Sequence, residues 1–244
     1  MSDDKPLVNY DEELAKLAKL ASQVEKPAGS SVGCRAGILT LNGTQVPENK
    51  LDVIIIASTY ANLYYDEEFD ADNPRNPICF AYSEDGENMA PHIKSSHMQH
   101  ENCDTCPWNQ WKSDPKTHKG KACKNTRILV MIPASTKPED IPIAEAATFK
   151  LPVTSVKGWG MYVDKLNILH HRPPLGITTQ IGIVPDLKTQ FKITFKDTGF
   201  VNNDCIPALI ARLPAALEMT HIIFDPNPEL SDEEKAKAAK PKKY

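Results

Sequence analysis

The sequence predicts an α+β fold rich in β-strands, either an oligonucleotide-binding-type barrel or a bent antiparallel sheet, with two or three helices and a cysteine-rich loop insertion. Short strand patterns dominate, and they come in hairpin-like units. One helical pattern separates two groups of strands, and another lies near the C-terminus. Strands and helices do not alternate regularly, which argues against a doubly wound parallel sheet.

The composition indicates a cytoplasmic protein with no membrane segment. The chain has 244 residues, of which 41% are hydrophobic, enough for a sizeable core. Its longest apolar run, VIIIA within residues 51–57, is far shorter than the roughly 20 residues that span a bilayer. The acidic N-terminus lacks the apolar core of a signal peptide. Thiols in the cytoplasm stay reduced, which favours metal binding over disulfides.

Three segments are expected along the chain. Residues 1–30 read as a helix and a linker, because Leu14, Leu17, Ala21 and Val24 follow helical spacing before the KPAGSS sequence breaks it. Residues 31–224 form a single β-rich domain. Residues 225–244 have no apolar face and are expected to be a disordered tail.

The first half of the domain reads as strands. The pair Asn42-Gly43 is a strong hairpin signal. Residues 51–65 are β-branched and apolar, typical of a long buried strand, with a bend expected near Ser58. A short strand is expected at 77–82, then a loop-rich insertion at about 84–124, after which residues 126–133 resume the sheet.

The second half adds a strand near 145–153, a helix, a pair of strands and a second helix. The first helix, capped by Thr154 or Ser155 and ended by residues 172–174, carries an apolar face: Trp159, Tyr162, Val163, Leu166 and Leu169. Residues 176–185 and 190–200 alternate like paired strands. The second helix is expected to be capped near Asp204 and kinked or split at Pro214.

The cysteines of the insertion indicate a structural zinc site. Cys103 and Cys106 form a C-x-x-C pair, and Cys123 lies within the range of a second ligand-bearing turn. Structural zinc takes four ligands, and Cys79 is the preferred fourth, with His92 as the alternative and His97, His100 and His118 also nearby. Cys34 and Cys205 read as core residues. A redox role would need a thioredoxin-like frame, which the pattern lacks.

The same insertion carries the features of a single-strand binder. Two tryptophans, Trp108 and Trp111, can stack on nucleobases. Six basic side chains can follow a phosphate backbone: Lys112, Lys116, Lys119, Lys121, Lys124 and Arg127. The net charge of −4 excludes binding by bulk positive charge, so the local field must act. The alternative is that the tryptophans cover the zinc site, which suits Trp108 better than Trp111.

Four stretches resemble a family of tailed-phage and prophage early proteins: PICFAYSEDGENMAPH, CDTCPWNQWKSD, GKACKNTRILVMIP and LPVTSVKGWGMYVDKL. The resemblance spans about residues 52–200, and Cys79, Cys103, Cys106, Cys123, Asn109 and Trp111 fall on matching positions. Lys112 stands where the family pattern has glycine, which suggests a different turn. Family members are uncharacterised or assigned to single-stranded DNA binding in replication or recombination. The design is also similar to the T-even phage helix-destabilising protein, a barrel with a zinc subdomain.

The resemblance implies a non-enzymatic phage protein that binds single-stranded DNA in the host cytoplasm, with phage or host replication and recombination proteins as possible partners. One alternative is a phage protein that inhibits or redirects a host protein through its acidic residues 64–88, which carry Asp66, Glu67, Glu68, Asp70, Asp72, Glu84, Asp85 and Glu87. Another is a His-Asn-His-type nuclease using His100, Asn109 and His118, although the spacing is not that of a ββα motif.

Overall fold

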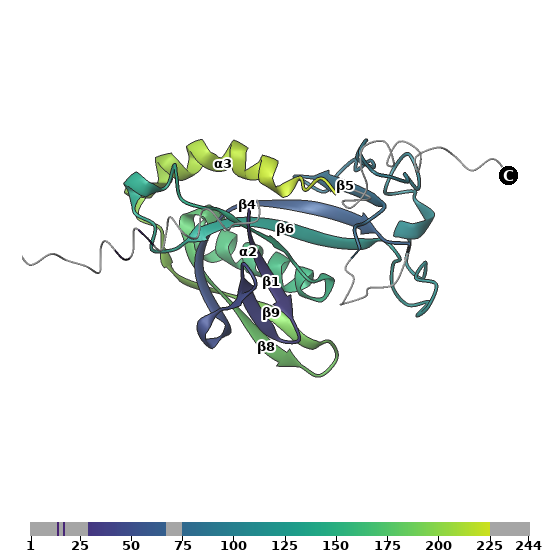
Figure 1. Ribbon diagram of the computed structural model, residues 1–244, viewed down its shortest axis with the longest axis horizontal. Coiled ribbons are helices and arrows are strands. Elements are labelled where there is room, and N and C mark those ends of the chain that lie inside the picture. The colour runs from purple at the N-terminus through teal and green to yellow at the C-terminus, as the bar shows by residue number, and fades with distance from the viewer. Residues whose placement is uncertain (1–13, 15–16, 18–28, 67–74, 225–244) are drawn as a thin grey trace, which may run out of the picture.

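A single curled sheet organises the molecule (Figure 1). The computed structural model describes residues 14, 17, 29–66 and 75–224. Within them the strand order is β3-β2-β1-β7-β6-β4-β8-β9, and β5 also pairs with β4. The strands are β1 (Ser30–Arg35), β2 (Ile38–Leu41), β3 (Thr44–Gln45), β4 (Lys50–Tyr64), β5 (Cys79–Ser83), β6 (Lys124–Pro133), β7 (Ala147–Lys150), β8 (Ile177–Asp186) and β9 (Gln190–Phe200). The α-helices are α2 (Val156–His170) and α3 (Ile206–Thr220).

The predicted β-rich α+β class, with a bent sheet and two helices, is confirmed for the described residues. The sheet is mixed, however, and not antiparallel throughout, because β1 and β7 pair in parallel. These two strands are far apart in the chain. Side-chain alternation shows which face of a strand is buried, but not the direction in which distant strands pair.

The longest strand, β4, is the centre of the sheet. It pairs with β8 over residues 50–54, with β5 over residues 60–64 and with β6 along most of its length. A register shift against β6 falls between Ile55 and Ala57, just before the bend expected near Ser58. An extra residue in one strand bends it locally, so β4 can serve both halves of the curled sheet.

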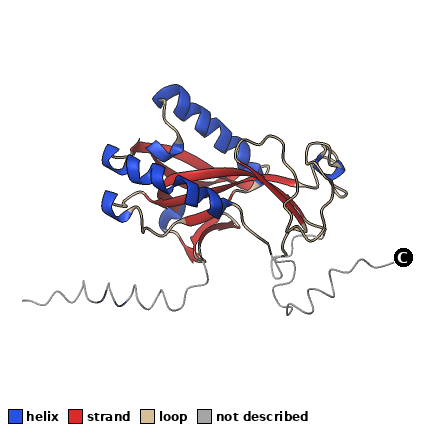
Figure 2. Cartoon of the chain, turned by 90° about the horizontal axis from the view of Figure 1, so that it is seen from above, coloured by secondary structure: helices blue, strands red, loops and turns tan. Residues whose placement is uncertain are grey.

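Both faces of β4 are buried, which explains its uninterrupted apolar run. Val53 and Ile55 join the core that packs against α2, together with Phe149 and Leu166. Ile54 and Ile56 face the opposite way, into the core covered by α3. Figures 1 and 2 show the two helices on opposite sides of the long strands, with α3 lying along β4. A strand buried on both faces cannot alternate apolar and polar residues.

The predicted helix near 154–171 is confirmed, with two local differences. Trp159, Tyr162 and Leu166 are buried as expected, but Leu169 at the last turn is exposed. There His170, not Leu169, faces the sheet, with its ring against Phe200 of β9. Ser155 takes the N-cap position without capping the helix. Its hydroxyl oxygen instead accepts a hydrogen bond from the Ile193 amide on β9, at 3.0 Å.

The C-terminal helix passes through Pro214 as one helix and is not split. Pro214 is exposed, so its ring and the carbonyl group left without a partner face water. The cap also differs from the expectation. Asn202, not Asp204, supplies the side-chain oxygen, which accepts the Asp204 amide at 3.1 Å and starts the short turn before α3.

The predicted N-terminal helix lies outside the described residues apart from Leu14 and Leu17, as does the tail from residue 225. None of the helices in the described ranges is long and apolar enough to cross a membrane.

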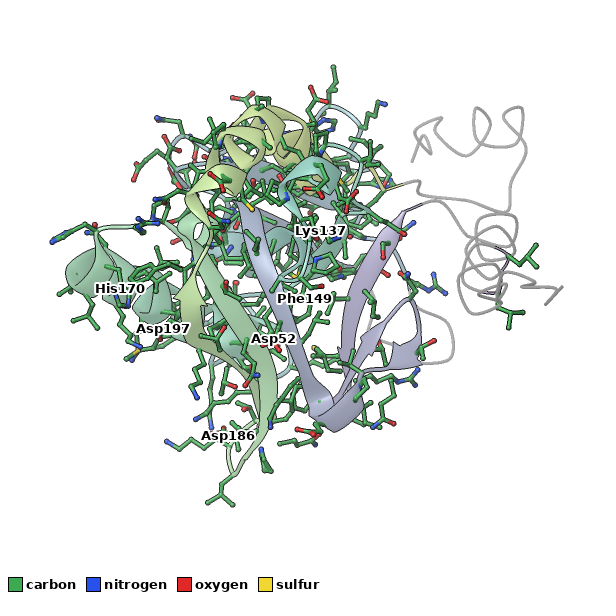
Figure 3. The ribbon with its side chains drawn as sticks, turned by 90° about the vertical axis from the view of Figure 1, so that its left-hand side faces the viewer. Asp52, Lys137, Phe149, His170, Asp186 and Asp197 are labelled. Carbon is green, nitrogen blue, oxygen red and sulfur yellow. The ribbon has the colours of Figure 1, made fainter. Side chains whose placement is uncertain are left out.

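Phe149 tests the inner core. Its side chain is fully buried at the centre of the molecule (Figure 3). Phe149→Ala should lower the free energy of unfolding by about 3–5 kcal/mol, because it removes apolar burial and leaves a cavity. Leu187→Ala, at an exposed position in the β8–β9 turn, should change it by less than about 0.5 kcal/mol. Urea denaturation followed by circular dichroism measures both, and equal effects would contradict this placement of the core.

Candidate functional site

The insertion emerges from the end of β4 and its two neighbours. Residues 84–123 link β5 to β6, and the strand register sets Tyr64 beside Cys79 and Leu63 beside Lys124. In Figure 1 these residues form the loops beyond the ends of the long strands. The His92 amide bonds to the Phe80 carbonyl at 2.7 Å. The insertion leaves β5 after Ser83, so this bond ties it back to the first half of the same strand.

Four cysteines of this region line one small cavity of about 20 Å³. Cys79 comes from β5, Cys103 and Cys106 from the middle of the insertion, and Cys123 from its end. Each is only 7–8% exposed. Every pair among the four interacts electrostatically, and all six cysteines of the chain have free thiols. The fold therefore gathers the four sulfurs that the sequence singled out.

The environment of the thiols opposes their ionisation. Burial, followed by the charges of Cys103, Cys79 and Cys106, raises the pKa of Cys123 to about 12. Burial also raises the pKa of Cys79 and Cys103, although hydrogen bonds from the Gln99 backbone to Cys79 and from the Asn62 side chain to Cys103 act the other way. As placed, no three His, Cys, Asp or Glu side chains among the described residues form a group that could hold a metal ion.

The preferred alternative ligand, His92, lies outside the cavity. His92 stacks on Phe80 with ring centroids 5.1 Å apart, and its Nδ1 accepts the Lys94 amide. It does not line the cavity, whereas His100 does. Cys205 is buried in the core under α3, and Cys34 is partly buried against the core under α2, as expected of core residues.

Asn109 connects the cysteines to the sheet. Its side-chain amide donates to the Cys103 carbonyl at 2.7 Å, and its oxygen accepts from Asn125 on β6 at 2.9 Å and from Lys121 at 3.3 Å. Asn125 also donates to Asn62 on β4. Both ends of the Asn109 amide thus have hydrogen-bond partners within the fold.

The two tryptophans differ. Trp108 stacks on Tyr64 at 5.3 Å, and its carbonyl accepts the Cys123 amide at 2.9 Å, so it covers the cysteine cavity. Trp111 is 74% exposed, with the Lys121 ammonium group 6.0 Å from its ring centroid. Trp111, the tryptophan that the sequence analysis considered the better candidate for stacking on a base, is therefore the exposed one.

The six predicted basic residues do not form one surface. Lys116 and Lys124 line a pocket described below, and Lys119 is exposed. The Arg127 guanidinium lies 3.2 Å from the Tyr60 ring centroid, and its burial lowers its pKa. Lys112 has φ +71°, so it keeps the left-handed conformation for which glycine is suited.

A pocket of about 770 Å³ lies between the insertion and the sheet, hereafter the basic pocket. It is lined from 63–66 at the end of β4, 75–76, 114–116 and 122–126 of the insertion and β6, and 150–153 after β7. Its charged residues are Arg75, Lys116, Lys124 and Lys150 against Asp66 and Asp114. The pocket carries an excess of positive charge in a protein of net negative charge.

Several pocket residues were missed by the sequence analysis: Tyr64, Tyr65, Arg75 and Lys150. The Lys150 ammonium group donates to the Tyr65 hydroxyl at 3.2 Å. Lys150 stands alone at the end of β7, and Arg75 and the two tyrosines lie outside the lysine-rich insertion. The Tyr64-Tyr65 pair at the end of a buried strand was the available signal.

Asp114 shapes the insertion side of the pocket. Its carboxylate accepts the Thr117 and Lys116 amides at 3.1 and 3.0 Å and pairs with Lys124 at 3.2 Å. These contacts, the Thr117 amide first, lower the pKa of Asp114 to about 2. The carboxylate stays charged at neutral pH and holds Lys124 at the pocket.

Neither the cysteine cavity nor the basic pocket is built mainly from the acidic residues of segment 64–88. Glu67, Glu68, Asp70 and Asp72 lie outside them. Asp66 lines the basic pocket, while Asp85 accepts a hydrogen bond from Ser83 and stabilises its own turn.

Comparison with known proteins yields no match: no protein-family model, no curated protein and no solved structure is significantly similar to the chain.

Asn109→Ala tests the link between insertion and sheet. It leaves the buried Cys103 carbonyl and the Asn125 amide without this partner, so it should lower the free energy of unfolding by about 1–3 kcal/mol and speed cleavage of the insertion by protease. Glu101→Ala, at an exposed position of the same loop, is the control. Unchanged cleavage rates in both variants would refute the linking role.

Proposed function

We propose that the protein binds single-stranded DNA, without catalysis, through the basic pocket and the adjoining exposed face of the insertion. The observation that carries the proposal is that aromatic rings and cationic side chains line the same pocket. Tyr64 and Tyr65 lie beside Lys116, Lys124 and Lys150. Aromatic rings that stack on bases next to cations that attract phosphates are the usual means of binding single strands.

The connectivity of the sheet supports the same proposal. In an oligonucleotide-binding barrel, the first strand pairs with the second and the fourth, and a helix joins the third to the fourth. Here β4 pairs with β6 and β8, β7 follows β6, and α2 joins β7 to β8. The order β4-β6-β7-α2-β8-β9 thus follows the barrel, and β1 pairs with β7 at the edge where a fifth strand would close it.

In that arrangement the insertion is the loop between the first and second barrel strands. Oligonucleotides bind such barrels on the face of strands two and three and on this loop. The basic pocket is lined by the start of β6, the end of β7 and the insertion, which are those same elements. The position of the pocket therefore agrees with its chemistry.

Outside the pocket, Trp111 and Lys121 offer a further stacking and charge contact on the exposed side of the insertion. Arg127 is given a structural part instead, because its guanidinium is stacked on Tyr60 and half-buried. The resemblance to phage and prophage early proteins supports a role in replication or recombination in the cytoplasm of a bacterial host, with proteins of those processes as partners.

Substitutions on the sheet side of the pocket test the proposal. Tyr65→Ala should weaken binding to a labelled oligo-dT by about 1–3 kcal/mol if its ring stacks on a base, and Lys150→Gln should lower the slope of log affinity against log salt by about 0.7. Fluorescence anisotropy at several salt concentrations measures both.

On the exposed face of the insertion, Trp111→Ala and the Lys119→Ala/Lys121→Ala double substitution should weaken binding with little loss of folding.

The matched controls are Tyr65→Phe, which keeps the ring, and Lys137→Gln, which removes an exposed cation beyond the opposite end of β6 (Figure 3). Both should bind like the unsubstituted protein. No binding of single-stranded DNA at low salt, or equal binding of duplex and single strand, would rule the proposal out.

A further inference from the structure

The cysteine cavity lies next to the basic pocket, and its chemistry is unexplained by DNA binding alone. We propose that one zinc ion binds between Cys79, Cys103, Cys106 and Cys123, and that this ion holds the insertion wall of the basic pocket in place. The second part rests on the function proposed above, whereas the first does not.

Four buried thiols around one void suit a soft divalent cation. Structural zinc prefers four cysteine sulfurs in a tetrahedron, about 2.3 Å from the ion. The cavity of about 20 Å³ exceeds the roughly 10–15 Å³ that a water molecule needs, so it has room for one ion, although the side chains as placed do not yet form a metal-binding group. Binding replaces four S–H bonds by four Zn–S bonds and releases four protons to water, with no change of oxidation state. The sulfurs then move inward from their present positions.

The groups around the sulfurs suit thiolates. Polar groups lie near two of the sulfurs: the Gln99 backbone and the Ser95 side chain near Cys79, and the Asn62 side chain near Cys103. Donors of this kind orient metal ligands and stabilise their charge. Asn62 belongs to β4, so part of this outer layer is built into the sheet.

The ligands join three segments of the chain. Cys79 is the first residue of β5, Cys123 directly precedes β6, and Cys103 with Cys106 lies in the loop between. Apart from the turn Pro107–Asn109, the loop between β5 and β6 has no helix or strand. An ion bound to all four would close the loop onto both strands that carry it.

The pocket wall is attached at the same place. Ala122 and Lys124, on either side of Cys123, line the basic pocket. The Cys123 amide bonds to the Trp108 carbonyl, and the Trp108 ring stacks on Tyr64, which lines the pocket too. Loss of the ion would loosen Lys116 and Lys124, while Tyr65 and Lys150 would stay on the sheet.

The metal is tested on the full chain, by mass-spectrometric zinc content and by the absorption of thiolate-bound cobalt on titration with Co²⁺. The unsubstituted protein should hold one zinc per chain and give the cobalt–thiolate band. Cys79→Ser should lose both, because it removes the ligand on β5. Cys34→Ser, outside the cavity, and His92→Ala should keep both. Absence of metal in the unsubstituted protein, or full retention in Cys79→Ser, would overturn the site.

The coupling is tested by oligo-dT binding of the zinc-loaded protein, the chelator-treated protein and Cys79→Ser, with circular dichroism to check that the sheet remains. Removal of zinc should weaken binding at least about tenfold, or about 1.4 kcal/mol, and added zinc should restore it only in the chelated unsubstituted protein. Equal affinity with and without zinc would refute the coupling. A zinc-loaded protein that binds no oligonucleotide would refute the proposed function, while the zinc and cobalt measurements would still decide the metal site.

Discussion

The burial of β4 on both faces is the constraint on which the rest of the structure depends. Its first half separates the core under α2 from the core under α3, so each helix is positioned by alternate residues of one strand. Its second half continues past both cores and ends at Tyr64, where β5 and β6 flank it. A long strand held so firmly at one end provides a rigid base for side chains at the other. The insertion and the basic pocket both stand on that end.

The elements that the sequence predicted well are those whose pattern is local. The β-branched run of residues 51–65 and the helical spacing of Trp159, Tyr162 and Leu166 each depend on neighbours within a few positions. Predictions failed where a distant element decides the outcome. Leu169 has the right spacing for the core, but His170 takes the position that faces β9 in that turn. Ser155 is at a capping position, yet an amide of β9 takes its oxygen. Likewise, nothing within β1 indicates its parallel pairing with β7.

The same distinction applies to the site. Cys103, Cys106 and Cys123 could be grouped from their spacing, and Cys79 could be added because the insertion had to leave and rejoin one sheet. The basic pocket could not be found this way. Tyr65 and Lys150 are brought together by the pairing of β4, β6 and β7, and they are 85 positions apart in the chain. A search for clusters of lysine along the sequence finds the insertion but misses the sheet that faces it.

The structure also changes what the positive charge of the insertion can do. Lys121 bonds to Asn109, Lys124 is held by Asp114, and Arg127 lies on Tyr60, so three of the six predicted cations have contacts within the loop or the sheet. A polyanion would meet a pocket of four cations and two carboxylates, not a continuous basic stripe. Few phosphates can then be neutralised, and the electrostatic part of the affinity is small. Stacking on rings such as Tyr65 and Trp111 must therefore supply much of any binding energy. Since bases can stack in this way only when they are unpaired, such a site favours single strands over duplexes.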